Sequence, residues 1–134
     1  MKSLQAFLTA FLGIFMILGG IFHFATPEMY NPFIPDELPE LFINYVSGIV
    51  EIALGVGLFI PHFKSSAAFG IVILMIALLP LHILDVFKES PAIGSKQLAY
   101  IRLPLQFVLI YWAWCVRRSA GMYCVSPDEK AIGK

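Results

Sequence analysis

Five side chains of this sequence could carry chemistry, and all of them fall within or at the ends of long apolar stretches. They are His23, Glu51, His82, Arg102 and Gln106. A charged side chain at the centre of a bilayer costs about 2.5–3.5 kcal/mol on insertion scales. A chain that keeps such residues is expected to turn them inward, toward one another or toward a ligand. Together they are the candidate ligand-binding residues.

Glu51 and Arg102 are the expected electrostatic centre of such a pocket. In a medium of low dielectric a lone carboxylate is driven neutral, whereas a nearby arginine keeps it ionised. The alternative is a buried ion pair that only fixes the register of two helices. Helical phase alone leaves open whether the two side chains touch.

The same residue types could in principle hold a metal ion, but their spacing does not favour it. No H-x-x-x-H or E-x-x-H pattern is present. The sequence also contains no nucleophile–base arrangement, cofactor loop or zinc motif. We therefore expect no metal and favour a non-catalytic role, while catalysis by this chain stays open.

Four apolar segments must position these residues. They cover residues 4–24, 41–60, 66–86 and 98–116, and about 20 residues of helix cross a hydrocarbon core of about 30 Å. The chain is 59% hydrophobic and 13% charged, against about 45–50% and 25% in soluble domains. We predict an all-α integral membrane protein, with residues 1–134 forming one four-helix, up-down-up-down bundle. A Pro-rich outer loop joins the first two helices, and nothing suggests nucleic acid as a partner.

The distribution of charge predicts the orientation of the bundle. With four spans, both termini and the 61–65 link share one side, which holds Lys2, Lys64, Arg117, Arg118, Lys130 and Lys134. The opposite side has Lys88 and Lys96 beside Glu28, Asp36, Glu37 and Glu40. Because basic residues concentrate in cytoplasmic loops, we expect both termini in the cytoplasm.

This topology places all five candidates in the outer half of the membrane. His23 and His82 fall near outer helix ends, and the rise per residue puts Glu51 about 15 Å deep, Arg102 about 6 Å and Gln106 about 12 Å. Polar groups from all four spans are therefore expected to converge on one outward-facing pocket. His23 taken alone is also consistent with a hydrogen-bonded histidine at the interface.

Helical phase suggests which faces meet. Glu51 shares a face with Gly48 and Gly55, and small residues allow close helix approach in membranes. Glu51 should therefore face a neighbouring helix. Asp85 is expected to be a solvated helix end, and Pro80 is expected to kink the third span near His82.

The link at 26–40 and the cysteines leave alternatives open. The link contains Pro27, Pro32, Pro35 and Pro39 among apolar side chains, which predicts either a stiff interfacial loop or a lid over the bundle mouth. Cys115 and Cys124 form no C-x-x-C pair, so packing residues or free thiols are expected.

Four motifs occur in a recognisable order. They are Gly20-Ile21-Phe22-His23-Phe24, Ile34-Pro35 to Leu38-Pro39, Ser47-Gly48-Ile49-Val50-Glu51 and Arg102-Leu103-Pro104-Leu105-Gln106. Through them, and over residues 4–116, the chain resembles the DoxX-like family of small four-helix membrane proteins, in particular its uncharacterised bacterial branch. The resemblance implies a bacterial cytoplasmic (inner) membrane. Where that branch typically reads Pro-Ala-Asn-Ile, this chain has Pro80-Leu81-His82-Ile83.

The resemblance implies several functional classes. Relatives include subunits associated with a thiosulfate:quinone oxidoreductase, a protein needed to mature an amine dehydrogenase, and partners in oxidant-defence assemblies. Fold analogy does not choose among them.

Three functions are therefore kept. The first is a subunit that binds a quinone- or lipid-like molecule for a redox or stress-defence assembly. The second is an assembly factor or chaperone that recognises a client protein. The third is a small solute or proton-coupled transporter, which the lack of an inverted repeat disfavours.

Overall fold

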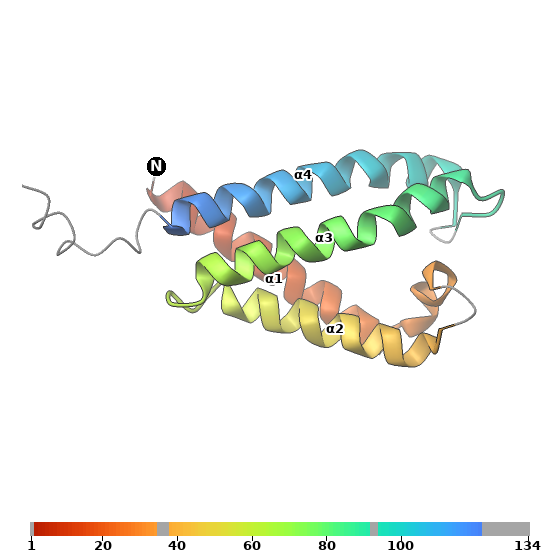
Figure 1. Ribbon diagram of the computed structural model, residues 1–134, viewed down its shortest axis with the longest axis horizontal. Coiled ribbons are helices and arrows are strands. Elements are labelled where there is room, and N and C mark those ends of the chain that lie inside the picture. Colours follow the sequence, from red (N-terminus) through yellow and green to blue (C-terminus); the bar gives the residue numbers. More distant parts are fainter. Residues whose placement is uncertain (1, 35–37, 92–93, 122–134) are drawn as a thin grey trace, which may run out of the picture.

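The computed structural model describes residues 2–34, 38–91 and 94–121, and these residues are helical with short connections. Two short 3-10 helices, η1 (Pro27–Met29) and η2 (Asn31–Phe33), follow the first long helix (Figure 1). The long helices are α1 (Lys2–Ala25), α2 (Glu40–Gly57), α3 (Lys64–Phe87) and α4 (Lys96–Gly121). All four are long and apolar enough to cross a bilayer. The prediction of an all-α chain with four candidate membrane spans is confirmed.

Two helix ends differ from the predicted spans by three residues or more. α2 stops at Gly57 rather than at 60, because the chain tightens there into turns in which Phe59 N donates to the Val56 carbonyl and Ile60 N to the Gly57 carbonyl. α4 continues to Gly121 rather than ending at 116. Hydropathy marks where apolar residues end, whereas a helix can continue through arginines. The Arg117 guanidinium there packs 3.9 Å from the centre of the Phe69 ring.

The outer surface of this bundle differs from that of a water-soluble one. Large apolar side chains cover the outside of every long helix, with Phe7 63% exposed and Tyr111 70% exposed. The buried polar residues are Thr9, His23, Asn44, Glu51, His82, Asp85 and Gln106. Such a surface would be a very large apolar patch in water, whereas it matches the hydrocarbon of a membrane.

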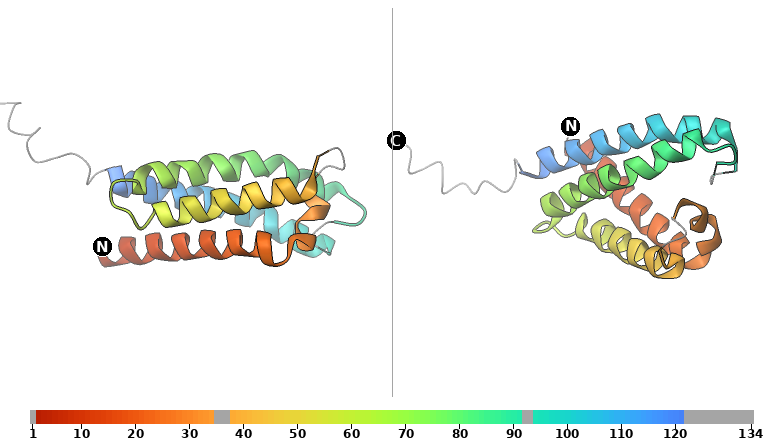
Figure 2. Two further views of the ribbon diagram at one scale, coloured as in Figure 1. Left: turned by 90° about the horizontal axis from the view of Figure 1, so that it is seen from below. Right: turned by 45° about the vertical axis from the view of Figure 1, so that its right-hand side comes forward.

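The helices pack mainly as two pairs, α1 on α2 and α3 on α4 (Figure 2). Glycines bring α1 and α2 close together. A Cβ on Gly20 would lie 2.6 Å from the Gly48 carbonyl oxygen, and one on Gly55 would lie 2.8 Å from the Gly13 carbonyl oxygen. Both glycines on the predicted small face of α2 therefore contact α1, and Glu51 lies between them on that face.

The two ends of the molecule have different interiors. Figure 1 shows the start of α1, the α2–α3 link and the end of α4 together at one end, with η1, η2 and the α3–α4 link at the other. The apolar core contains Leu12, Leu58, Ala67, Ile71 and Ala113, which belong to the first end. The buried histidines and Asn44 belong to the second. Polar chemistry is therefore concentrated near the η1–η2 end.

Candidate functional site

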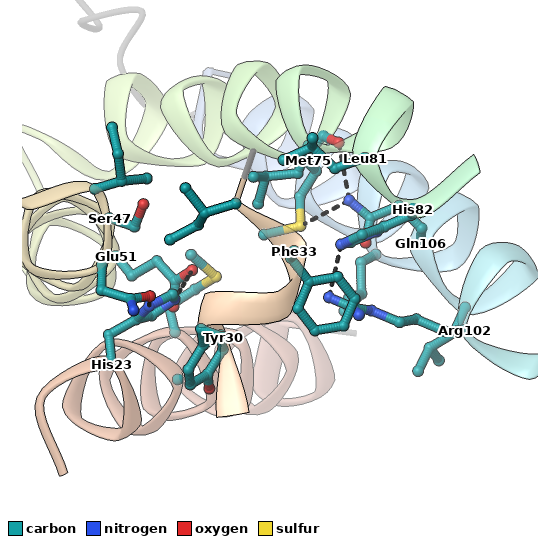
Figure 3. Close-up of a pocket in the computed structure, with 18 of the residues that line it drawn as sticks. His23, Tyr30, Phe33, Ser47, Glu51, Met75, Leu81, His82, Arg102 and Gln106 are labelled. Carbon is teal, nitrogen blue, oxygen red and sulfur yellow. Dashed lines mark hydrogen bonds and ion pairs between the residues drawn. The ribbon is translucent and has the colours of Figure 1, made fainter. Parts of the chain in front are cut away.

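A cavity of about 260 Å³ lies between the two helix pairs (Figure 3). All five sequence-predicted candidates line it. The other lining residues come from all four long helices and from the α1–α2 connection: Phe15, Met16, Gly19, Tyr30, Phe33, Ile34, Ile43, Asn44, Ser47, Met75, Leu78, Leu81, Leu105 and Leu109. Polar groups therefore face the cavity from each helix, between mainly apolar walls.

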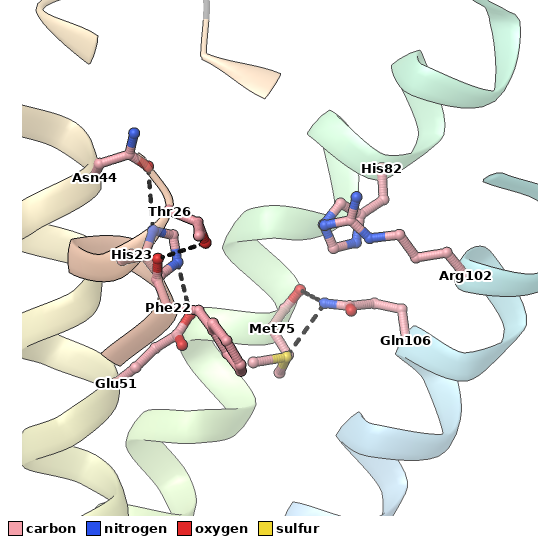
Figure 4. A network of polar contacts seen from close by, with 9 residues as sticks. All are labelled: Phe22, His23, Thr26, Asn44, Glu51, Met75, His82, Arg102 and Gln106. Atoms are coloured by element: carbon pink, nitrogen blue, oxygen red, sulfur yellow. Dashed lines mark hydrogen bonds and ion pairs between the residues drawn. The ribbon is translucent and has the colours of Figure 1, made fainter. Parts of the chain in front are cut away.

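The Glu51 cluster, formed by His23, Asn44, Glu51 and Asn31, occupies the α1–α2 side. His23 Nε2 lies 3.5 Å from Glu51 Oε1, and His23 Nδ1 lies 3.1 Å from Asn44 Oδ1 (Figure 4). The Asn44 amide nitrogen donates to the Pro27 carbonyl at 3.2 Å and to Asn31 Oδ1. The cluster ties α1 and α2 to the connection between them.

These contacts assign the proton on one nitrogen of His23. The Asn44 amide nitrogen is used in donating, so the Asn44 oxygen faces His23 and must accept from Nδ1–H. Nε2 can then either donate to an ionised Glu51 or accept from a protonated Glu51.

The Arg102 cluster, formed by Arg102, His82 and Phe33, occupies the α3–α4 side. Arg102 Nη2 donates to His82 Nε2 at 2.7 Å, and the guanidinium carbon lies 4.2 Å from the centre of the Phe33 ring. Arginine has no acceptor, so His82 Nε2 must accept and the proton of His82 must sit on Nδ1. His82 is therefore neutral here, with a single N–H.

Two donors of this cluster lack an acceptor. Among the residues that the structure describes, neither His82 Nδ1 nor Arg102 Nη1 has a hydrogen-bond partner, although both atoms are buried. A buried donor without a partner costs about 1–3 kcal/mol. Because both side chains line the cavity, this side is suited to a ligand that brings hydrogen-bond acceptors.

The structure gives Glu51 and Arg102 separate side-chain partners. They line the same cavity, but Glu51 pairs with His23 on α1, and Arg102 with His82 on α3. The physical reason is the packing of the bundle in pairs, which gives each charged residue a histidine from its own pair as the nearest partner. Helical phase predicts the face of a helix but not which neighbour that face meets.

Gln106 and Asp85 are also buried. Gln106 donates to the Met75 carbonyl at 2.8 Å, which links α4 to α3. Asp85, expected to be a solvated helix end, is 2% exposed. That expectation was wrong, because distance from the end of an apolar run does not show whether another part of the chain covers the residue.

The α1–α2 connection covers the end of the cavity. The Tyr30 ring stacks on His23 with 3.8 Å between ring centres, and the Phe33 ring lies edge-on to His82. Lys88 Nζ donates to the Pro32 carbonyl at 3.1 Å. Burial, followed by the negative charge of Glu51, raises the pKa of Tyr30 above its ordinary value, so its hydroxyl stays protonated at neutral pH.

Comparison with known proteins places the chain in a family. The model of a domain of unknown function, DUF8561, matches residues 12–117. The chain belongs to the DUF8561 family. No curated protein and no solved structure matches it. The family description assigns no activity, so the function of this DUF8561 protein has to be argued from its cavity.

The candidates drawn from the sequence of this DUF8561 protein omit, among other cavity residues, Asn44, Tyr30 and Phe33. Asn44 precedes Glu51 by seven positions and therefore lies on the same helix face, a signal that could have found it. No comparable pattern identifies Tyr30 or Phe33, since their place depends on how the connection folds back.

Several other expectations concern the thiols, the metal and the chain ends. Cys115 is a free, exposed thiol, whereas Cys124 lies outside the described residues, as do Pro35, Asp36, Glu37, Lys130 and Lys134. α3 continues as an α-helix through Pro80, the residue at which a kink is expected. Within the described part of the chain, no three His, Cys, Asp or Glu side chains are grouped so that they could hold a metal ion.

Proposed function

We propose that this protein crosses a bacterial cytoplasmic membrane four times, up and down, with both termini in the cytoplasm. The charge distribution supports this orientation. Lys64, Arg117 and Arg118 lie at the end of the molecule where α1 begins (Figure 1), and basic residues favour the cytoplasmic side. The Pro-rich connection and the end of the cavity that it covers then face outward.

We also propose a relationship to the DoxX-like proteins. Its support is the set of motifs at 20–24, 47–51 and 102–106. These motifs contribute His23, Glu51, Arg102 and Gln106 to a single cavity. Because the motif residues line the cavity, a relationship based on them favours a shared ligand-binding role over shared helix packing alone.

The cavity is proposed to bind a quinone- or lipid-like molecule, as the non-catalytic subunit of a redox or stress-defence assembly. The observation that carries this proposal is the pair of buried donors without an acceptor, His82 Nδ1–H and Arg102 Nη1–H, in a mainly apolar cavity. A quinone carbonyl is an acceptor of the required kind. Across the cavity, His23 and Glu51 supply the polar side chains that would face the second carbonyl.

A role as an assembly factor is the second candidate. It is favoured by the apolar side chains that the α1–α2 connection presents outward, with Met29 64% and Leu38 46% exposed. A client's transmembrane helix could contact these side chains. A transporter is the third candidate, and flux into proteoliposomes above that of empty vesicles would be its test.

The test is native mass spectrometry of the full-length protein extracted mildly from its own membrane. We would compare the wild type with Arg102→Met and Glu51→Gln, and use Arg118→Met as a matched control, because Arg118 is exposed and lies outside the cavity. The proposal predicts a small bound mass in the wild type and in Arg118→Met that is lost in Arg102→Met and weakened in Glu51→Gln.

The other outcomes are equally informative. A stoichiometric second protein without any small mass would favour the assembly factor and make both clusters structural. A small mass that survives in Arg102→Met would show that the ligand does not use this cavity.

A further inference from the structure

Two residues lining the cavity are exposed on the outside of the bundle. Phe15 of α1 is 45% exposed and Leu105 of α4 is 50% exposed, whereas the other lining residues are buried or half-buried. Both belong to helices long enough to span the membrane. Their exposed sides therefore face hydrocarbon, and the cavity reaches the lipid-facing surface between α1 and α4.

This opening, defined by Phe15 and Leu105, has a closed end. One helical turn before Phe15, the Phe11 ring stacks on Trp112 of α4 with 5.6 Å between ring centres. Beyond this contact α1 and α4 diverge toward the η1–η2 end (Figure 2, right). Leu109, which lies between Trp112 and Leu105 along α4, lines the cavity. The gap is thus sealed on one side by an aromatic pair and leads into the cavity on the other.

The size of the cavity limits what it can enclose. An engineered cavity of about 150 Å³ takes up benzene, so about 260 Å³ suits a single substituted ring. A ring together with a long hydrocarbon tail does not fit. A lipid-soluble ligand with its ring inside must leave its tail elsewhere, and the opening beside Phe15 is apolar and borders the bilayer.

We infer that the ligand is a one-ring quinone with a hydrocarbon tail, which enters sideways from the bilayer between α1 and α4. Its ring occupies the cavity, where its carbonyl oxygens meet the Arg102 and Glu51 clusters. Its tail leaves between Phe15 and Leu105 into lipid. This inference rests on the proposed function and adds the route of entry and the chemical class of the ligand.

The test uses a decyl-substituted benzoquinone with a photoreactive diazirine in its tail, added to the full-length protein in lipid nanodiscs. After illumination, adducts are mapped by peptide mass spectrometry, with and without an excess of a tail-less benzoquinone. We expect adducts on α1 near Phe15 and on α4 near Leu105, and we expect the tail-less quinone to abolish them.

Substitutions at the opening give an independent readout. Phe15→Trp and Leu105→Trp should narrow the passage and slow exchange of the decyl quinone at least fivefold relative to the wild type. Ile14→Trp is the matched control, because Ile14 is 51% exposed and does not line the cavity. It should leave the exchange rate unchanged.

The failures can be told apart. Competed adducts that lie on α2 and α3, or exchange that is equally fast in all variants, would overturn the lateral route and leave ring binding intact. Adducts that the tail-less quinone does not compete away would mean that no ring-binding site exists, which would overturn the proposed function as well.

Discussion

The Glu51 cluster and the Arg102 cluster face each other across one cavity, and each contains a histidine. The difference between them lies in the partners. His23 is held on both ring nitrogens, by Asn44 and by Glu51. His82 is held on one nitrogen by Arg102, and its other nitrogen has no partner among the described residues. The first cluster therefore has a partner for each ring nitrogen of its histidine, whereas the second keeps a buried N–H that has none among the described residues.

This contrast distinguishes buried polar side chains that stabilise the fold from buried polar side chains that are proposed to bind a ligand. Buried polar groups in lipid are costly unless paired. The Glu51 cluster offsets that cost by tying α1, α2 and their connection together, so its removal should weaken the fold. The Arg102 cluster contains buried donors that have no partner among the described residues, so we expect its removal to weaken binding.

The largest effect is expected for Arg102→Met. Loss of a charge-assisted hydrogen bond of about 1.5–3 kcal/mol should reduce the affinity for a tail-less benzoquinone about 10- to 150-fold, measured by saturation binding in nanodiscs. Arg118→Met should bind like the wild type. Equal affinity in the two variants would remove the distinction between the clusters.

Asn44→Leu tests the structural cluster. It removes the acceptor of His23 and the donor to Asn31 and Pro27. Because buried groups left unpartnered cost about 1–3 kcal/mol each, we expect the free energy of unfolding in detergent micelles to fall by about 3 kcal/mol. His82→Asn should cost less than about 1 kcal/mol, since an amide can still accept from Arg102. Similar losses in both variants would contradict the comparison.

Gly19→Ala tests where the Glu51 carboxylate lies in the Glu51 cluster. A Cβ at this position would lie 2.7 Å from Glu51 Oε2, so the carboxylate has to move away. Overpacking of this kind costs about 1–3 kcal/mol, and we expect the lower end because a side chain can shift. Gly121→Ala is the control, since nothing lies within 4 Å of its Cβ position. Unfolding in micelles measures both, and an unchanged Gly19→Ala would show that Glu51 does not fill this space.

The smallest effect concerns Tyr30 at high pH. Burial and the charge of Glu51 raise its pKa in the folded protein. A raised pKa favours the protonated form in the folded state, so stability is full below the unfolded value of about 10 and falls as the pH rises through the folded pKa. Tyr30→Phe should lose less stability between pH 9 and 11 (about the range of phenol ionisation) than Tyr45→Phe. Parallel pH profiles for the two variants would show that Tyr30 is not buried against His23.

The spans and the face that carries Glu51 could be predicted from the sequence, because hydropathy and the spacing of Gly48 and Gly55 report them directly. The partners of Glu51 and Arg102 could not. They depend on which helices pair, and the close approach of Gly20 to Gly48 that pairs α1 with α2 becomes specific only once both helices are placed.

The connection between α1 and α2 was the least predictable part. Its prolines and aromatic residues allowed either a loop or a lid, and the contacts of Tyr30 and Phe33 are tertiary. The burial of Asp85 escaped prediction for a similar reason, since position near a helix end says nothing about what folds over it.

The central claim is that His82 presents a single N–H, on Nδ1, to a ligand in the cavity. The most direct measurement is ¹⁵N solid-state NMR of the histidine-labelled protein in lipid. The protein has only three histidines, and the variants His62→Asn and His82→Asn assign their resonances. We predict a neutral His82 protonated on Nδ1, whose Nδ1 resonance shifts when a benzoquinone is added. A His82 protonated on Nε2, or a spectrum that the quinone leaves unchanged, would contradict the claim.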